Sequence, residues 1–228
     1  MKYIIFDIDG TLTDTTATDD QCFTQALEEV FHFKNFSTEY GDYTNTTDSG
    51  IIDQLFREQL GRSFTWQERN HFIRRFCELL EQAYKKQPGC ISEINNAGRT
   101  LKALYRQTNL SIGLATGGWQ ESAQFKLRCA GIPIQRHTAA SFAQDAMARN
   151  EIISDTIRKM DTYNGVKMEL SEIVYIGDGN WDYLAAKQLG INFIGIENKR
   201  LDHLSEIIKI SDYDHLHRHI GLQTNTIG

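Results

Sequence analysis

Four short apolar runs recur along the chain, and the first three end in polar, glycine-bearing turns. They cover residues 2–7 (KYIIFD), 111–116 (SIGLAT), 172–178 (EIVYIGD) and 192–197 (NFIGIE). Runs of this length bounded by turn residues predict buried β-strands. Apolar residues at helical spacing fill the segments between them, at 91–107, 119–130, 150–160 and 180–189. This alternation predicts an α/β fold: a Rossmann-like parallel sheet with helices on both faces.

One segment, residues 15–85, interrupts the alternation. It carries three consecutive helical patterns, at 19–33, 49–60 and 66–85. Thr65 and Glu68 have the spacing of a capping box at the start of the third. We therefore expect two domains, an α/β core from residues 1–14 and 86–228 and an inserted helical cap subdomain from residues 15–85.

The polar ends of the predicted strands carry the candidate chemistry, because ligands of parallel sheets bind beyond the carboxyl ends of the strands. Asp7 and Asp9 end the first strand, Thr116 the second and Asp178 the third. Burying like charges is costly unless a metal or a cation compensates them. Such pairs are typical of catalysis or metal binding. A turn with two solvated aspartates is the simpler alternative.

Three motifs resemble those of the haloacid dehalogenase superfamily, most of whose members are phosphatases. They are DIDGTLTD at 7–14, ATGG at 115–118 and GDGNWD at 177–182, in the family's order and on three predicted strands. The helical segment at 15–85 resembles the cap that the family inserts after its first motif. The resemblance covers nearly the whole chain.

The family's third motif departs from its usual form. Where the family most often has a Lys, Arg149 lies 29 residues before Asp178. We assign the cation role to Arg149, because a guanidinium keeps the charge and adds a planar fork suited to phosphate. Lys159 and Lys167 are the rivals, and for both a solvated surface position is the simpler interpretation.

The resemblance implies catalytic roles for four residues. Asp7 would attack phosphorus and form an aspartyl-phosphate. Asp9 would protonate the leaving oxygen and then activate water. Thr116 and Arg149 would stabilise the transferring oxygens. Because carbon–halogen cleavage needs no acid at the second aspartate position, Asp9 favours phosphate chemistry over dehalogenation.

The resemblance also implies ligand sites. The metal would be Mg²⁺, and its predicted site comprises Asp7, Asp9 through its carbonyl, Asp178 and Asp182. Asp182 would support the metal through water or pair with Arg149. The predicted phosphate-binding residues are Gly10, Thr11, Thr116, Gly117 and Arg149. Thr47, in the polar stretch 44–50, is a further candidate for substrate contact, although it could serve only as a helix cap.

The leading hypothesis is thus a Mg²⁺-dependent phosphatase acting on a small phosphate monoester, such as a sugar phosphate or a phosphoglycolate-like compound. A phosphomutase of the same fold is the alternative, because the motifs do not separate the two. A non-catalytic, phosphate-ligand-binding regulatory protein is a third reading.

Composition narrows the possible partners and location. The formal net charge of −6 does not indicate binding to the negatively charged backbone of a nucleic acid. No apolar run approaches the length of a membrane span. The four cysteines are widely spaced, which favours reduced thiols. We expect a cytoplasmic protein, monomeric or homodimeric, whose partner is a small phosphorylated metabolite.

Overall fold

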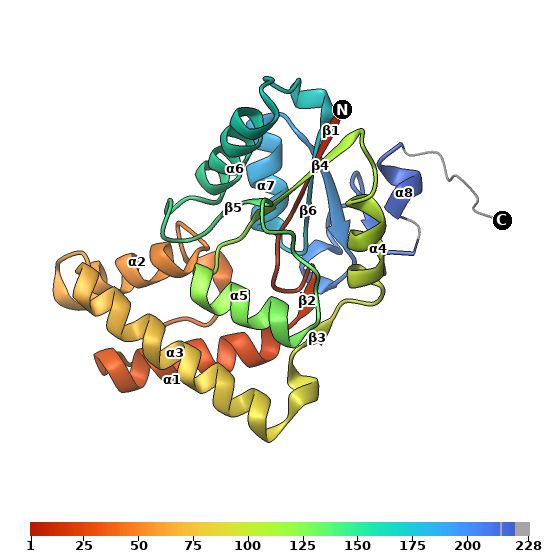
Figure 1. The fold of residues 1–228 in the computed structure, drawn as a ribbon. Helices are drawn as coiled ribbons and strands as arrows, with labels where there is room; N and C mark the ends of the chain where they lie inside the picture. The colour runs from red at the N-terminus through yellow and green to blue at the C-terminus, as the bar shows by residue number, and fades with distance from the viewer. Residues whose placement is uncertain (215, 222–228) are drawn as a thin grey trace.

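A computed structural model describes residues 1–214 and 216–221. Six parallel strands form a sheet in the order β5-β4-β1-β6-β7-β8 (Figure 1). The strands are β1 (Lys2–Phe6), β4 (Leu110–Ala115), β5 (Ala139–Ser141), β6 (Ile173–Gly177), β7 (Asn192–Ile196) and β8 (Ile208–Ile210). The predicted α/β fold with a parallel sheet is confirmed.

Helices cover both faces of this sheet. They are α4 (Ala97–Leu104), α5 (Gln120–Cys129) and α8 (Leu216–His219) on one face, and α6 (Arg149–Asn164) and α7 (Asn180–Leu189) on the other. The central strand β1 shows why both faces are covered. Ile4 and Phe6 enter the apolar cluster of the first face, whereas Tyr3 and Ile5 enter that of the second. Since side chains alternate along a strand, an unbroken apolar run needs an apolar layer on each side.

Three further helices lie beyond the end of the sheet, at the lower side of Figure 1. They are α1 (Thr16–Phe31), α2 (Asp48–Leu60) and α3 (Trp66–Lys86), here called the helical layer. The capping box of Thr65 and Glu68 starts α3 as predicted. The layer has its own apolar cluster, in which Phe72 and Phe76 are fully buried.

The chain enters and leaves the helical layer through a two-stranded antiparallel ribbon. It joins β2 (Thr13–Asp14) to β3 (Ser92–Glu93). The ribbon lies close to the boundaries predicted at 14/15 and 85/86, and the division into two domains stays a prediction. Residues from the sheet side also enter the layer's apolar cluster, most notably the fully buried Trp119.

Some sequence-based bounds were wrong. The helix expected over 91–107 begins at Ala97, because Asn96 adopts a left-handed conformation (φ 66°) and Ser92–Glu93 pair with β2. The edge strands β5 and β8 were not predicted, since each has only three residues.

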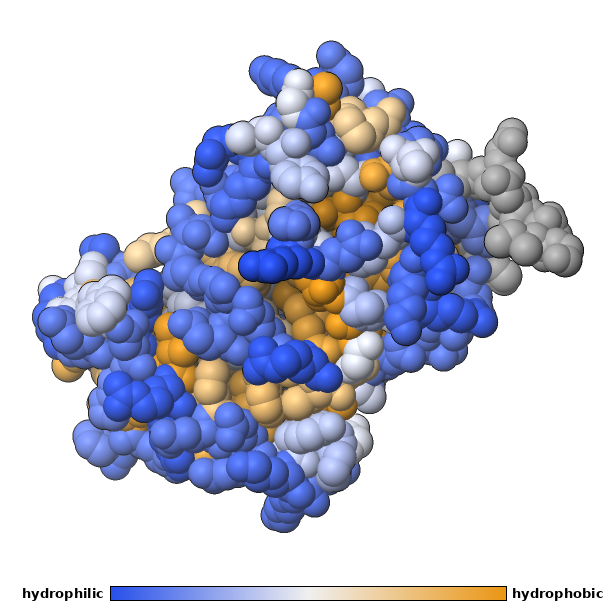
Figure 2. All heavy atoms as spheres, in the orientation of Figure 1, coloured by the Kyte–Doolittle hydropathy of each residue, from blue (hydrophilic) through white to orange (hydrophobic). Residues whose placement is uncertain are grey.

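The surface facing the viewer in Figure 2 is mostly hydrophilic, with apolar patches in hollows near its middle. One groove, beside β5 and α5, is lined by Leu127, Ile132 and Phe142 among others. No helix among the described residues has the length and apolar content that crossing a membrane requires.

Candidate functional site

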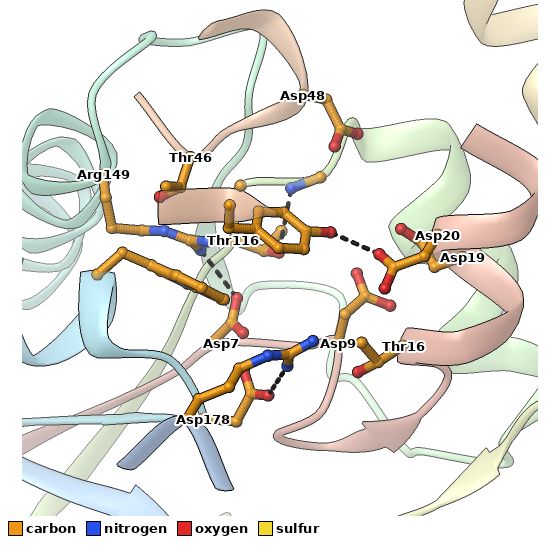
Figure 3. Close-up of a pocket in the computed structure, with 15 residues that line it drawn as sticks. Asp7, Asp9, Thr16, Asp19, Asp20, Thr46, Asp48, Thr116, Arg149 and Asp178 are labelled. Carbon is orange, nitrogen blue, oxygen red and sulfur yellow. Dashed lines mark hydrogen bonds and ion pairs between the residues drawn. The ribbon is translucent and has the colours of Figure 1, made fainter. Parts of the chain in front are cut away.

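The carboxyl ends of the three central strands open into one pocket, as the topology predicts. Asp7 follows β1, Thr116 follows β4 and Asp178 follows β6 (Figure 3). The pocket holds about 440 Å³ of space between atoms, part of it open to solvent. Its other walls come from the helical layer and the loops beside it: Thr16, Asp19, Asp20, Tyr40, Thr46 and Asp48. The sheet and the helical layer therefore build the pocket jointly.

Asp7 lies at the bottom of this pocket and is 3% exposed. One of its oxygens accepts a hydrogen bond from Arg149 Nη1 at 3.1 Å, and the other faces the Thr11 hydroxyl at 3.4 Å. Burial raises the pKa of Asp7 well above its usual value; Arg149 opposes this rise, while Asp182, Asp178 and Asp9 add to it. Asp7 is thus one member of a buried acidic group that a cation would stabilise.

Arg149 is the first residue of α6, and its side chain crosses toward β1. Besides Asp7, it contacts Asp182, with Nε 3.4 Å from Oδ1. Burial alone would lower the pKa of Arg149, but Asp182 and Asp7 raise it above its usual value, so the guanidinium is charged. A Cβ added at Gly117 would lie 2.7 Å from Arg149 Nη2, so the loop after β4 passes directly beside the guanidinium.

The two rival lysines do not reach the pocket. Lys159 pairs instead with Asp155 at 2.7 Å and hydrogen bonds to Ala140 O. Lys167 is exposed in the loop after α6. Of the three candidates, Arg149 alone contacts Asp7, as the spacing suggested.

Asp7, Asp178 and Asp182 form a buried carboxylate cluster that could hold a metal ion, with oxygens within 4.8 Å of one another. Burial, and then Asp182, raise the pKa of Asp178 to about 7, against the pull of Arg200 and Arg149. A Cβ at Gly10 (φ 72°) would lie 2.2 Å from Asp178 Oδ2, so the loop after β1 passes directly beside that carboxylate. The surplus of buried negative charge fits a hard cation.

Asp182 has protein donors on both oxygens. Tyr175 donates to Oδ1 at 3.0 Å, and the Gly179 backbone N–H donates to Oδ2 at 3.0 Å. Burial raises the pKa of Tyr175 well above its usual value, which keeps this donor protonated. Arg149 also lies beside Asp182, which is the pairing expected from the sequence. Asp182 is thus fixed by protein donors at the back of the carboxylate cluster.

Three of the predicted phosphate or substrate residues do not line the pocket. Both Gly10 and Thr11 lie in the loop after β1, where the Gly10 N–H donates to Thr13 O and the Thr11 hydroxyl faces Asp7. Thr47 caps α2 by accepting the Gly50 N–H, and its hydroxyl donates to Met147 O at 2.6 Å. Its neighbours Thr46 and Asp48 face the pocket instead.

Two cations of the site were missed by sequence reasoning. Arg200 Nη1 lies 2.7 Å from Asp178 Oδ2, and the guanidinium lies over the rings of Tyr40 and Trp181. Lys126, in α5, lies behind the pocket with its side chain 1% exposed and paired with Asp9 and Asp19. No local motif marks either residue.

The two tryptophans that follow the motifs have different positions. Trp181 lines the pocket, and its ring is tilted by 36° against that of Tyr40, with the ring centroids 4.8 Å apart. Trp119 is buried in the apolar cluster of the helical layer, and its indole N–H donates to Ser49. Trp181 is therefore part of the pocket wall, whereas Trp119 packs at the start of α5.

This chain belongs to the haloacid dehalogenase-like hydrolases: the family's sequence profile matches residues 4–196. The match covers all three motifs that carry the resemblance. It assigns the chain to an enzyme family of hydrolases, which typically use a metal ion. No curated protein matches the sequence significantly.

Solved structures show the same fold. A hydrolase from Pseudomonas syringae has 22% identity over 98% of this chain and 100% of its own, with a TM-score of 0.69. CbbY from Rhodobacter sphaeroides, in complex with phosphate, has 17% identity over 95% and 96%, with a TM-score of 0.71. A predicted phosphoglycolate phosphatase from Haemophilus somnus has 18% identity over 96% and 97%, with a TM-score of 0.58.

Proposed function

We propose that this protein is a Mg²⁺-dependent phosphatase that hydrolyses a small phosphate monoester through an aspartyl-phosphate on Asp7. The observation that carries this is the convergence of Asp7, Thr116, Arg149 and Asp178 in one pocket. A nucleophile, a hydroxyl, a fixed cation and a metal-binding carboxylate are the groups that phosphoryl transfer needs. The phosphate complex of the similar structure CbbY supports the same chemistry.

The reaction would proceed in two displacements. The Asp7 carboxylate forms a bond to phosphorus as the ester's P–O bond breaks, and Asp9 gives its proton to the leaving oxygen. Water then attacks the aspartyl-phosphate, Asp9 takes a proton from it, and Asp7 and inorganic phosphate are released. Arg149 and Thr116 would hold the transferring oxygens throughout.

The metal would be held by Asp7, the backbone carbonyl of Asp9 and Asp178, with Asp182 beside them. When bound, Mg²⁺ supplies positive charge between the carboxylate and the phosphoryl group. The helical layer would act as a cap over the pocket and select the substrate. The substrate would be a small phosphorylated metabolite, and we place the protein in the cytoplasm.

Inorganic phosphate release from a panel of small phosphomonoesters, with Mg²⁺ and with EDTA, tests the proposal. Release that requires Mg²⁺ is expected, and the panel would rank sugar phosphates against phosphoglycolate. A bisphosphate added with a sugar phosphate covers phosphomutase activity, which would give isomerised product with little free phosphate. Folded protein that processes no ester under either condition contradicts the proposal.

The raised pKa of Asp178 gives a stability prediction. The carboxyl has a pKa of about 7 when folded, against 3.8 for the isolated group. A group whose folded pKa is raised stabilises the fold while protonated, and this contribution is lost as the pH rises from about 4 through 7. In EDTA, the melting temperature of Asp178→Asn relative to that of the wild type should therefore increase as the pH is raised from 5 to 8.

The same melting temperatures should also be measured with Mg²⁺ in place of EDTA. Mg²⁺ should raise the melting temperature of the wild type more at pH 8 than at pH 5, since protons compete for Asp178. The Asp178→Asn variant should lose most of this shift. A variant that melts in parallel with the wild type at every pH, with and without Mg²⁺, would show that Asp178 neither titrates in this range nor binds the metal.

A further inference from the structure

Among the residues that the structure describes, Lys126 carries the most deeply buried cation that the reaction proposed above does not use. Lys126 extends from α5 and its side chain is 1% exposed. Its Nζ lies 2.6 Å from Asp9 Oδ2 and 2.5 Å from Asp19 Oδ1, and 6.0 Å from the centre of the Phe76 ring. Burying an ammonium is costly, and two carboxylates at hydrogen-bond distance offset this cost.

The Asp9 carboxylate is held at both oxygens. Lys126 donates to Oδ2, and the Thr15 hydroxyl donates to Oδ1 at 2.6 Å. Thr15 is itself buried and shares a hydrogen bond with Thr13 at 2.9 Å. The rotamer of Asp9 is therefore set by groups behind the pocket wall, whereas Asp9 itself faces the pocket.

The same ammonium joins two parts of the molecule. Asp9 belongs to the loop after β1, whereas Asp19 belongs to α1 of the helical layer. Burial raises the pKa of Asp19 to about 7, and Lys126 opposes that rise. A cation at this point thus links the orientation of Asp9 to the position of the layer that covers the pocket.

We propose that Lys126 is a positioning residue for the phosphatase reaction, holding the Asp9 carboxylate in place for proton transfer and tying it to helix α1 through Asp19. The proposal rests on the proposed function, because it assigns Lys126 a role in that reaction. Lys126 does not line the pocket, so it acts through Asp9 and not on the substrate.

Leaving-group dependence distinguishes this role from a merely structural one. A proton from Asp9 is needed for an alkyl ester, whose leaving alkoxide is strongly basic, and hardly for a nitrophenyl ester. Lys126→Met should therefore lower kcat/KM for alkyl phosphates by roughly 10²-fold and for p-nitrophenyl phosphate by only about threefold. Lys126→Arg should recover part of the loss. Arg128→Met, on the exposed side of the same helix, should leave both substrates unchanged.

A double-mutant cycle tests whether Lys126 acts through Asp9. In an Asp9→Asn background, Lys126→Met should cost little further activity on alkyl phosphates. The Lys126→Met protein could fail to fold, because two buried carboxylates would lose their cation. The double variant Lys126→Met with Asp19→Asn then removes one charge of each sign, and Asp9 still lacks the Lys126 ammonium beside it.

Three outcomes overturn the proposal. Equal losses on alkyl and aryl esters, or additive losses with Asp9→Asn, would show that Lys126 has only a structural role while leaving the phosphatase proposal intact. Absence of phosphate release from every ester by the wild-type protein would remove both proposals together.

Discussion

Asp7→Asn is expected to reduce phosphate release by about 10⁵-fold, the scale on which loss of a nucleophile acts. An amide oxygen cannot form the acyl-phosphate bond, although Asn keeps the shape of Asp. The measurement is turnover on the best ester of the panel, with Mg²⁺ present.

The same variant should not be less stable. Burial raises the pKa of Asp7 well above its usual value, so the ionised carboxylate destabilises the metal-free fold at neutral pH. Removing that charge should leave the melting temperature in EDTA unchanged or higher. Lost activity together with retained stability assigns the loss to chemistry.

A trapping experiment separates the roles of Asp7 and Asp9. With p-nitrophenyl phosphate, Asp9→Asn should still be phosphorylated but should lose the phosphoryl group slowly, because Asp9 no longer activates water. Intact-protein mass spectrometry should then show a gain of one phosphoryl group in Asp9→Asn and none in Asp7→Asn or in the double variant. A phosphoryl group that persists after Asp7 is replaced would place the nucleophile elsewhere.

The residues that the sequence predicted best lie at the ends of buried strands. Asp7, Thr116 and Asp178 each follow an apolar run that can only be a central strand, and the parallel order brings them together. In these three cases, local pattern and topology together determine the place of the side chain. Arg149 was also found, but through the resemblance to the haloacid dehalogenase superfamily, which implies a cation at about this distance before Asp178.

Lys126 and Arg200 were missed because their surroundings are made by distant segments. Lys126 lies in a helical pattern in which a lysine normally faces solvent, but α3 packs against α5 and Asp19 of α1 pairs with the buried ammonium. Arg200 lies in a short turn after β7 and meets Asp178 22 residues earlier in the chain. Burial and pairing that depend on distant segments produce no periodic pattern in the local sequence.

The wall of the pocket formed by the helical layer was predicted only in outline. In the polar stretch 44–50, Thr47 was the candidate for substrate contact, but it is Thr46 and Asp48 that face the pocket. Thr47 points elsewhere because the cap of α2 and Met147 O take its hydroxyl. An N-cap role fixes the direction of a side chain. The alternative that Thr47 serves only as a helix cap therefore explains why it does not face the pocket.

Arg149→Met is expected to lower kcat by between about 10² and 10³-fold, the usual cost of removing one donor that stabilises transition-state charge. It also leaves Asp7 and Asp182 without the cation that contacts both of them. Breaking a buried pair in this way costs about 3 kcal/mol of unfolding free energy, less at pH 5 than at pH 8, because protons then neutralise the carboxyls.

Arg149→Lys should keep more activity than Arg149→Met, since the charge remains, but a single ammonium cannot reproduce the contacts to both carboxylates. Lys159→Met is the matched control, because Lys159 lies on the same helix, pairs with Asp155 and stays outside the pocket. Its turnover should stay within about twofold of the wild type, because the half-buried Lys159 contacts no residue that lines the pocket. Were Lys159→Met to abolish turnover while Arg149→Met retained it, the cation of the third motif would be Lys159, and the contact between Arg149 and Asp7 would be a structural ion pair.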